Sequence, residues 1–130
     1  MAGSARVTKG GCRWRFVKAF TNDVADLALT LDDRHTLKRL LDRAAQGTVR
    51  SEEWEYPLSL GRGVIGELRM DIGDDKYRIM YHEPRDDLAG LLALGIMVKE
   101  HDDEGQWRQQ QNDFIEVARG RLIAEDGRRL

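Results

Sequence analysis

The most constraining feature of this 130-residue chain is the stretch from Val64 to Lys99, which reads VIGELRMDIGDDKYRIMYHEPRDDLAGLLALGIMVK. It contains an alternating segment, a Gly-Asp-Asp turn, a second alternating segment and a long apolar run. Alternation is typical of strands with one buried face, because successive side chains point to opposite sides. The apolar run from Leu88 to Val98 is typical of a strand covered on both faces. The stretch therefore predicts three consecutive antiparallel strands.

The two faces of this predicted sheet differ in chemistry. One face is apolar, and we expect it to form a single buried layer against Leu27, Leu40 and Leu41 of the preceding segment. That layer is predicted to hold Leu68, Met70, Tyr77, Ile79, Leu92, Leu94 and Ile96. The other face is predicted to carry the basic residues Arg69, Lys76, Arg78 and His82.

Size and composition favour one globular domain, since 130 residues with 41% hydrophobic and 34% charged residues can bury a core of ordinary size. We expect a flexible arm at 1–12, a domain at 13–125 and a tail at 126–130. A formal charge of −2 argues against wholesale binding of nucleic acid but allows a local basic patch. A single cysteine, Cys12, and the lack of a secretory signal predict a cytoplasmic protein. The scattered histidines have no metal-ligand spacing, so we expect neither a metal nor a cofactor.

The flanking segments predict one strand and three helices. Arg13 to Phe20 alternates imperfectly and suits a half-buried first strand, with Thr21 or Asn22 as the cap of the helix that follows. Two segments with apolar residues at helical spacing come next and predict a helical hairpin or a bent helix. Asp32 is expected to cap the second helix and Gly47 to end it. A last helix is expected from Gln106 or Trp107, docking through the stripe Phe114, Ala118 and Leu122.

This order of strand, helix, helix, three strands and helix predicts the α+β class. We expect the helices to pack on one face of a small antiparallel sheet. The opposite, basic face would then be available for a ligand.

The basic face suits a phosphate group. Arg69 and Arg78, on paired strands, could hold phosphate oxygens as a guanidinium fork does, and Lys99 could add a third cation. Lys76, Arg119 and Arg121 are further candidates for contacts to phosphate. The alternative for such arginines is pairing with a carboxylate such as Glu67 or Asp71. We expect the three tryptophans to act as packing anchors rather than as platforms for bases.

Cleavage of RNA without a metal uses the substrate's 2′-hydroxyl as nucleophile and needs a group that moves protons. The candidates here are His101, His82 and Tyr81. His101 is preferred because it follows Lys99 closely.

The chain resembles the RelE/ParE superfamily of toxins from toxin–antitoxin systems, with the phage-related HigB-like group as the closest branch. The resemblance covers the order of elements from Arg13 to Leu122. Its specific part comprises Glu67-Leu68-Arg69, Tyr77-Arg78-Ile79-Met80-Tyr81, the apolar strand ending in Lys99, and a helix with Ile115-Glu116-Val117-Ala118 and Arg121.

The resemblance implies a small cytoplasmic toxin that cuts messenger RNA, usually on the ribosome, without contact to membranes. It also implies a tightly bound antitoxin, expected to be a small helix-turn-helix protein encoded in the adjacent reading frame. Relatives place basic residues after the third strand, which favours Lys99 and His101 as catalytic residues together with Arg78 and Tyr81.

The chain departs from the family at one point, because Lys99 is followed by Glu100 and then by Asp102, Asp103 and Glu104. Acidic residues beside a phosphate site repel RNA. Two alternatives therefore stay open: a toxin that acts on a protein such as DNA gyrase, and a catalytically silent interaction protein.

Overall fold

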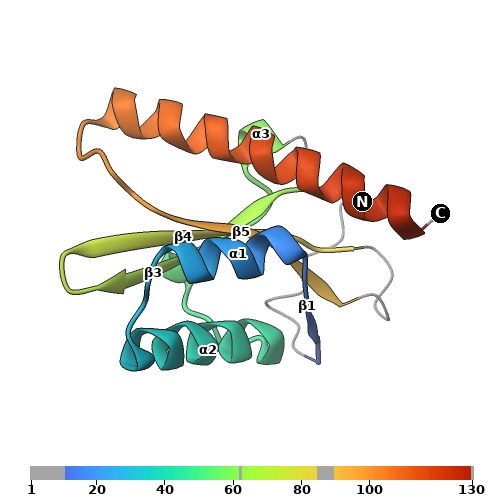
Figure 1. The fold of residues 1–130 in the computed structure, drawn as a ribbon, viewed down its shortest axis with the longest axis horizontal. Coiled ribbons are helices and arrows are strands. Elements are labelled where there is room, and N and C mark those ends of the chain that lie inside the picture. Colours follow the sequence, from blue (N-terminus) through green and yellow to red (C-terminus); the bar gives the residue numbers. More distant parts are fainter. Residues whose placement is uncertain (1–10, 62, 85–89, 130) are drawn as a thin grey trace.

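The computed structural model of the protein describes residues 11–61, 63–84 and 90–129, with side chains described as far as residue 126. Its elements, in chain order, are β1 (Trp14–Phe16), α1 (Lys18–Asp26), α2 (Leu31–Gln46), the short 3₁₀ turn η2 (Ser51–Glu53), β2 (Trp54–Glu55), the 3₁₀ turn η3 (Ser59–Gly61), β3 (Gly66–Ile72), β4 (Asp75–His82), β5 (Leu91–Val98) and α3 (Glu104–Arg129). The prediction of an α+β chain is confirmed (Figure 1).

The five strands form one sheet in the order β1-β5-β4-β3-β2. The three predicted antiparallel strands are β3, β4 and β5, and their pairing is antiparallel as expected. The prediction of a purely antiparallel sheet is wrong, because β1 lies beside β5 and runs parallel to it. Residues 88 and 89, predicted to begin the third strand, lie outside the described residues.

The helices cover both faces of the sheet, so the prediction that they share one face is also wrong. Helix α3 lies on one side of the strands and α2 on the other (Figure 1). The reason lies in β5, because all six residues from Leu91 to Ile96 are buried. A strand that is apolar on both sides needs cover on both sides.

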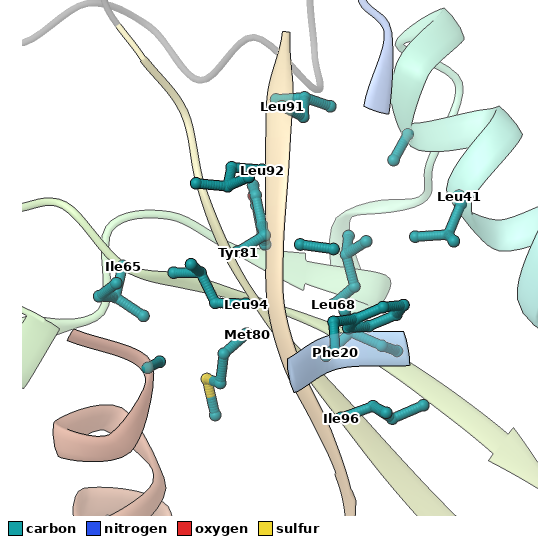
Figure 2. Close-up of a cluster of buried hydrophobic side chains, with 14 of the residues drawn as sticks. Phe20, Leu41, Ile65, Leu68, Met80, Tyr81, Leu91, Leu92, Leu94 and Ile96 are labelled. Carbon is teal, nitrogen blue, oxygen red and sulfur yellow. The ribbon is translucent and has the colours of Figure 1, made fainter. Parts of the chain in front are cut away.

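The predicted apolar layer is divided between these two faces. A register shift between β4 and β5 pairs Met80 with Gly95 but Tyr81 with Ala93, which leaves Leu94 as an extra residue in β5. Such a bulge reverses which side chains face which way. Figure 2 accordingly shows Leu92 and Leu94 on the α3 side of β5 and Ile96 on the opposite side. Phe20, Leu41 and Leu68 share the side of Ile96.

The first strand is shorter than predicted, because it ends at Phe16 and α1 begins at Lys18. Val17 is the N-cap, so the predicted caps at Thr21 and Asn22 are wrong. Val17 and Phe20 are both buried. They are three residues apart, and residues at that spacing lie on one face of a helix. Alternation over so few residues did not distinguish the two structures.

The ends of the other helices follow local signals more closely. Helix α2 is capped by a reciprocal pair between Thr30 and Asp33 rather than by the predicted Asp32. It ends at Gly47, as predicted, with φ of 78°. Helix α3 begins at Glu104, two or three residues before the predicted start at Gln106 or Trp107, and continues to Arg129 through most of the predicted tail.

Most of the predicted flexible arm, residues 1–10, lies outside the described residues. Cys12, in its last position, donates its backbone N–H to the carbonyl of Ala45 over 3.0 Å. A search of the described helices finds none that combines the length and the apolar character needed to cross a bilayer.

Two charged side chains complete the exposed edge of β5. Strand β1 pairs only with Leu91 to Ala93, so the later backbone groups of β5 need other partners on that edge. Asp23 of α1 accepts from the N–H of Ile96 over 3.3 Å, and Arg121 of α3 donates to the carbonyl of Leu94 over 2.9 Å. Arg121 Nη1 also lies 2.6 Å from Asp23 Oδ2. This pair joins α1, β5 and α3.

We expect Asp23→Ala to destabilise the fold, because it removes the carboxylate partner of the largely buried Arg121 guanidinium and the acceptor of the Ile96 N–H. Leaving such groups unpaired costs about 1–3 kcal/mol, which urea denaturation monitored by circular dichroism measures. Asp42→Ala is the matched control, since Asp42 forms an exposed pair with Lys38 whose loss costs under about 0.5 kcal/mol. Equal losses for the two variants would contradict a structural role for Asp23.

Candidate functional site

The predicted basic face is present on the side of the sheet that α3 covers. Arg69 of β3 and Arg78 of β4 are directly opposite each other in the register, so both side chains lie on the same face. Arg78 is also opposite Met97 of β5. The prediction that the two arginines share a face is therefore confirmed.

Carboxylates hold Arg69 in place. Its Nε donates to Glu67 and its Nη2 donates to Glu55, each over 2.9 Å. Glu67 is buried, with 2% exposed surface, and its other oxygen accepts from Gln111 of α3 over 3.0 Å. Burial alone would lower the pKa of Arg69, but attraction from Glu67 and Glu55 outweighs it and raises that pKa. Arg69 is thus a fixed positive charge that links the sheet to α3.

Arg78 is held less tightly by acids. Its Nη1 donates to the carbonyl of Tyr77 over 2.9 Å and lies 3.7 Å from Asp71, whose side chain is 65% exposed. Burial lowers the pKa of Arg78, and the charges of Glu67 and Asp71 oppose that effect only in part. The usual pKa of an arginine is so far above neutral that the guanidinium of Arg78 stays charged at neutral pH.

Arg78 and Lys99 both lie over the indole ring of Trp107, in the first turns of α3. The guanidinium carbon of Arg78 is 5.8 Å from the ring centroid and Nζ of Lys99 is 5.0 Å from it. Both distances are within the range of cation–π attraction. We refer to Arg78, Lys99 and Trp107 as the Trp107 cluster. Its members come from β4, from the residue after β5, and from α3.

Gln110 fixes the beginning of α3 against the end of β5. Its side-chain nitrogen donates to the carbonyl of Val98 over 2.9 Å, and its oxygen accepts from the N–H of Glu100 over 3.0 Å. The two bonds thus fix the residues immediately before and after Lys99. Because Gln110 is one helical turn after Trp107, the same bonds set the position of the ring relative to Lys99.

The three candidates for proton transfer occupy different environments. Tyr81 is fully buried against Trp14 and Tyr56, and burial raises its pKa well above 10.0. This position gives a substrate no access to its hydroxyl. His101 is half-buried in the connection between β5 and α3, two residues after Lys99. Of the three, His101 is nearest in the chain to the Trp107 cluster.

His82 lies at the far end of β4, about 13 Å along the strand from Arg78 at the usual rise per residue. Its Nδ1 is 2.7 Å from the carbonyl of Val64, which identifies this nitrogen as the protonated one in the neutral ring. Burial lowers the pKa of His82 from 6.5, with the hydrogen bond and Asp126 opposing this effect and Arg15 adding to it. The half-buried ring is therefore neutral at neutral pH.

The remaining predicted phosphate ligands are dispersed. Lys76 is exposed near the turn between β3 and β4, and its carbonyl accepts from the N–H of Lys99 over 2.6 Å. Arg119 binds both oxygens of Glu116, and Arg121 is engaged by Asp23. Arg119 is about 18 Å from Trp107 along the helix axis, at about 1.5 Å per residue. The structure thus brings Arg69, Arg78 and Lys99 together and leaves Arg119 and Arg121 apart from them.

The prediction from the sequence missed two contributors to this site, Trp107 and Gln110. The alternative that the arginines pair with Glu67 or Asp71 is confirmed, because Glu67 binds Arg69 over 2.9 Å and Asp71 lies 3.7 Å from Arg78. Trp107 and Gln110 are one turn apart at the start of a helix that follows Lys99, but only the docking of that helix shows that they face the end of β5.

Comparison of the chain with known protein families, with curated proteins and with solved structures found no match. The class that the fold and the site define is therefore a structural one. It is an α+β domain with a five-stranded mixed sheet between helices and a cationic cluster where β5 meets α3.

We expect the stability of the fold to decrease as the pH falls below 6.5, partly because of His82. Between 6.5 and the lowered pKa of the folded ring, the unfolded chain binds a proton that the folded chain does not, so acid favours unfolding. His82→Asn keeps a donor for Val64 and should reduce the change in the free energy of unfolding between pH 7 and pH 5. His35→Asn, at an exposed position on α2, is the control. An unchanged pH dependence in His82→Asn would contradict this account.

Proposed function

We propose that this protein is a toxin of the RelE/ParE class that cleaves messenger RNA on the ribosome without a metal ion. The observation that carries the proposal is that Arg69 and Arg78 lie opposite each other on one face of the sheet, while Arg78 and Lys99 both lie over the ring of Trp107. Support also comes from the order of elements, which is the one the resemblance implies apart from the two-residue strand β2 between α2 and β3.

The chemistry requires the 2′-hydroxyl of the substrate to attack the adjacent phosphorus while the 5′-oxygen of the next nucleotide leaves. Negative charge grows on the phosphate oxygens as the new bond forms, and fixed cations there stabilise the transition state. In our proposal Arg78 and Lys99 bind these oxygens, and Arg69 contributes its charge from the neighbouring strand. His101 takes the proton of the attacking 2′-hydroxyl and delivers it to the 5′-oxygen as that oxygen leaves.

The acids around the site are compatible with binding of phosphate. The side chains of Asp71 and Glu55 are 65% and 52% exposed, whereas those of their partners Arg78 and Arg69 are 11% and 30% exposed. Asp71 lies 3.7 Å from Arg78 and can turn to solvent, so a phosphate group can take its place at Arg78. Glu67 is buried and keeps Arg69 oriented. It does not compete with a substrate phosphate that arrives from solvent.

A second candidate is a toxin of the same class that acts on a protein such as DNA gyrase. The observation that favours it is the exposed acidic turn beside the Trp107 cluster, formed by Glu100, Asp102, Asp103 and Glu104. These carboxylates repel RNA but can meet a basic protein surface. Both candidates imply a cognate antitoxin, for which the adjacent reading frame is the first place to search.

Induced expression of the chain in a bacterial host should arrest growth and cleave transcripts, and Arg78→Ala with Lys99→Ala should abolish both effects. Loss of one comparable transition-state donor lowers the rate about 10²- to 10³-fold. Growth curves and primer extension on a reporter transcript measure the two effects. The variant must first show an unaltered circular dichroism spectrum.

Lys38→Ala with Arg39→Ala is the matched control, because it removes two positive charges from the exposed surface of α2. We expect this control to remain toxic. Growth arrest without transcript cleavage, combined with inhibition of supercoiling by gyrase in vitro, would favour the second candidate. Full toxicity of the Arg78 and Lys99 variant would refute the proposed site.

A further inference from the structure

Trp107 differs from the other two tryptophans in what surrounds its ring. The indole nitrogen of Trp14 donates to the carbonyl of Leu41 over 2.7 Å, and the ring packs against Tyr81 in the core. Trp54, on strand β2, is partly buried and packs against the hydrophobic core. Among the described residues, cations lie over the ring of Trp107 alone. Packing explains Trp14, but it does not explain why two cations gather at one half-buried aromatic ring.

We propose that Trp107 stacks a base of single-stranded RNA while Arg78 and Lys99 hold the phosphates on either side of that base. This inference rests on the proposed function, because it names the part of the substrate that the same site reads. The ligand it requires combines a flat aromatic group with a nearby anion, and a nucleotide unit has both.

A base can take the place of a cation on the ring. Lys99 is half-buried, so its ammonium group can leave the indole for a phosphate without being removed from a closed interior. Stacking of a base on an aromatic side chain is generally stronger than a cation–π contact at a partly exposed position. The exchange satisfies both groups, since the base covers the ring and the cation gains a charged partner.

The ring of Trp107 is also held in place before a ligand binds. Gln110 ties the first turns of α3 to Val98 and Glu100, on both sides of Lys99. The N–H of Gln106 donates to Asp103 over 2.9 Å, which caps the helix just before Trp107. Since these bonds fix the ring and the backbone around Lys99, the ligand has only the side chain of Lys99 left to move.

The test measures the affinity of the whole chain for three probes by fluorescence anisotropy. The first is a 2′-O-methyl oligoadenylate of six nucleotides, which cannot be cleaved through its 2′-hydroxyl. The second is an abasic oligomer of the same length, and the third is adenosine monophosphate in competition. We expect Trp107→Leu to weaken binding of the oligoadenylate about 5- to 150-fold and to leave binding of the abasic oligomer unchanged. Trp107→Phe should restore part of the loss.

The matched control is Phe16→Leu, because Phe16 is an aromatic residue with 49% exposed surface on β1, away from the cluster. It should bind all three probes like the unaltered chain. Equal weakening of the oligoadenylate and the abasic oligomer by Trp107→Leu would show a structural role for the ring and overturn the proposal. The proposal would also be overturned if the unaltered chain bound none of the probes. The same holds if adenosine monophosphate competed with an affinity equal to that of the six-nucleotide oligoadenylate.

These outcomes are separate from those of the toxicity assay. If the chain arrests growth and cleaves transcripts while Trp107→Leu binds like the unaltered chain, the platform is refuted and the proposed function stands. If the binding pattern holds but expression neither arrests growth nor cleaves transcripts, the proposed function is refuted and the platform stands.

Discussion

Strand β5 imposes the main constraint on this molecule, because it is buried on both faces and must still satisfy its backbone on both edges. Strand β4 pairs with one edge along its length, but β1 covers only three residues of the other. Asp23 and Arg121 supply the missing partners from α1 and α3. Gly95 allows this arrangement, since a Cβ there would lie 2.7 Å from both Arg121 Nη1 and Phe114 Cζ. The docking of α3, and with it the position of Trp107, depends on how the backbone groups of β5 beyond β1 find their partners.

The cationic face that results is largely neutralised by its own acids, but unevenly. Arg69 is bound to a buried carboxylate and belongs to the support of the sheet, whereas Arg78 and Lys99 rest on an aromatic ring. A ring attracts cations without cancelling their charge, so it can hold them in place while they remain able to bind an anion. This difference explains why two residues of the same predicted class have different roles in the site.

Much of the fold was predictable because local chemistry and global packing agreed over long segments. The three antiparallel strands followed from alternation around the Gly-Asp-Asp turn, and Gly47 followed from the preference for left-handed backbone at a helix end. Prediction failed where a short segment was compatible with two periods, as from Val17 to Phe20. It also failed at Leu92 and Leu94, because one extra residue in β5 reverses the faces and leaves no mark in the alternation of an all-apolar strand.

For the site, the sequence by itself determined that Arg69 and Arg78 face the same way, because two paired strands with a tight turn allow only one alternation of side chains. It also determined the basic residue at the end of β5. Only the tertiary structure decided which cations meet, since that depends on where α3 crosses the sheet. It separated Arg119 and Arg121 from the cluster and brought Trp107 to Lys99. Contacts between elements distant in the chain are set by the packing of whole faces, and no local period encodes that packing.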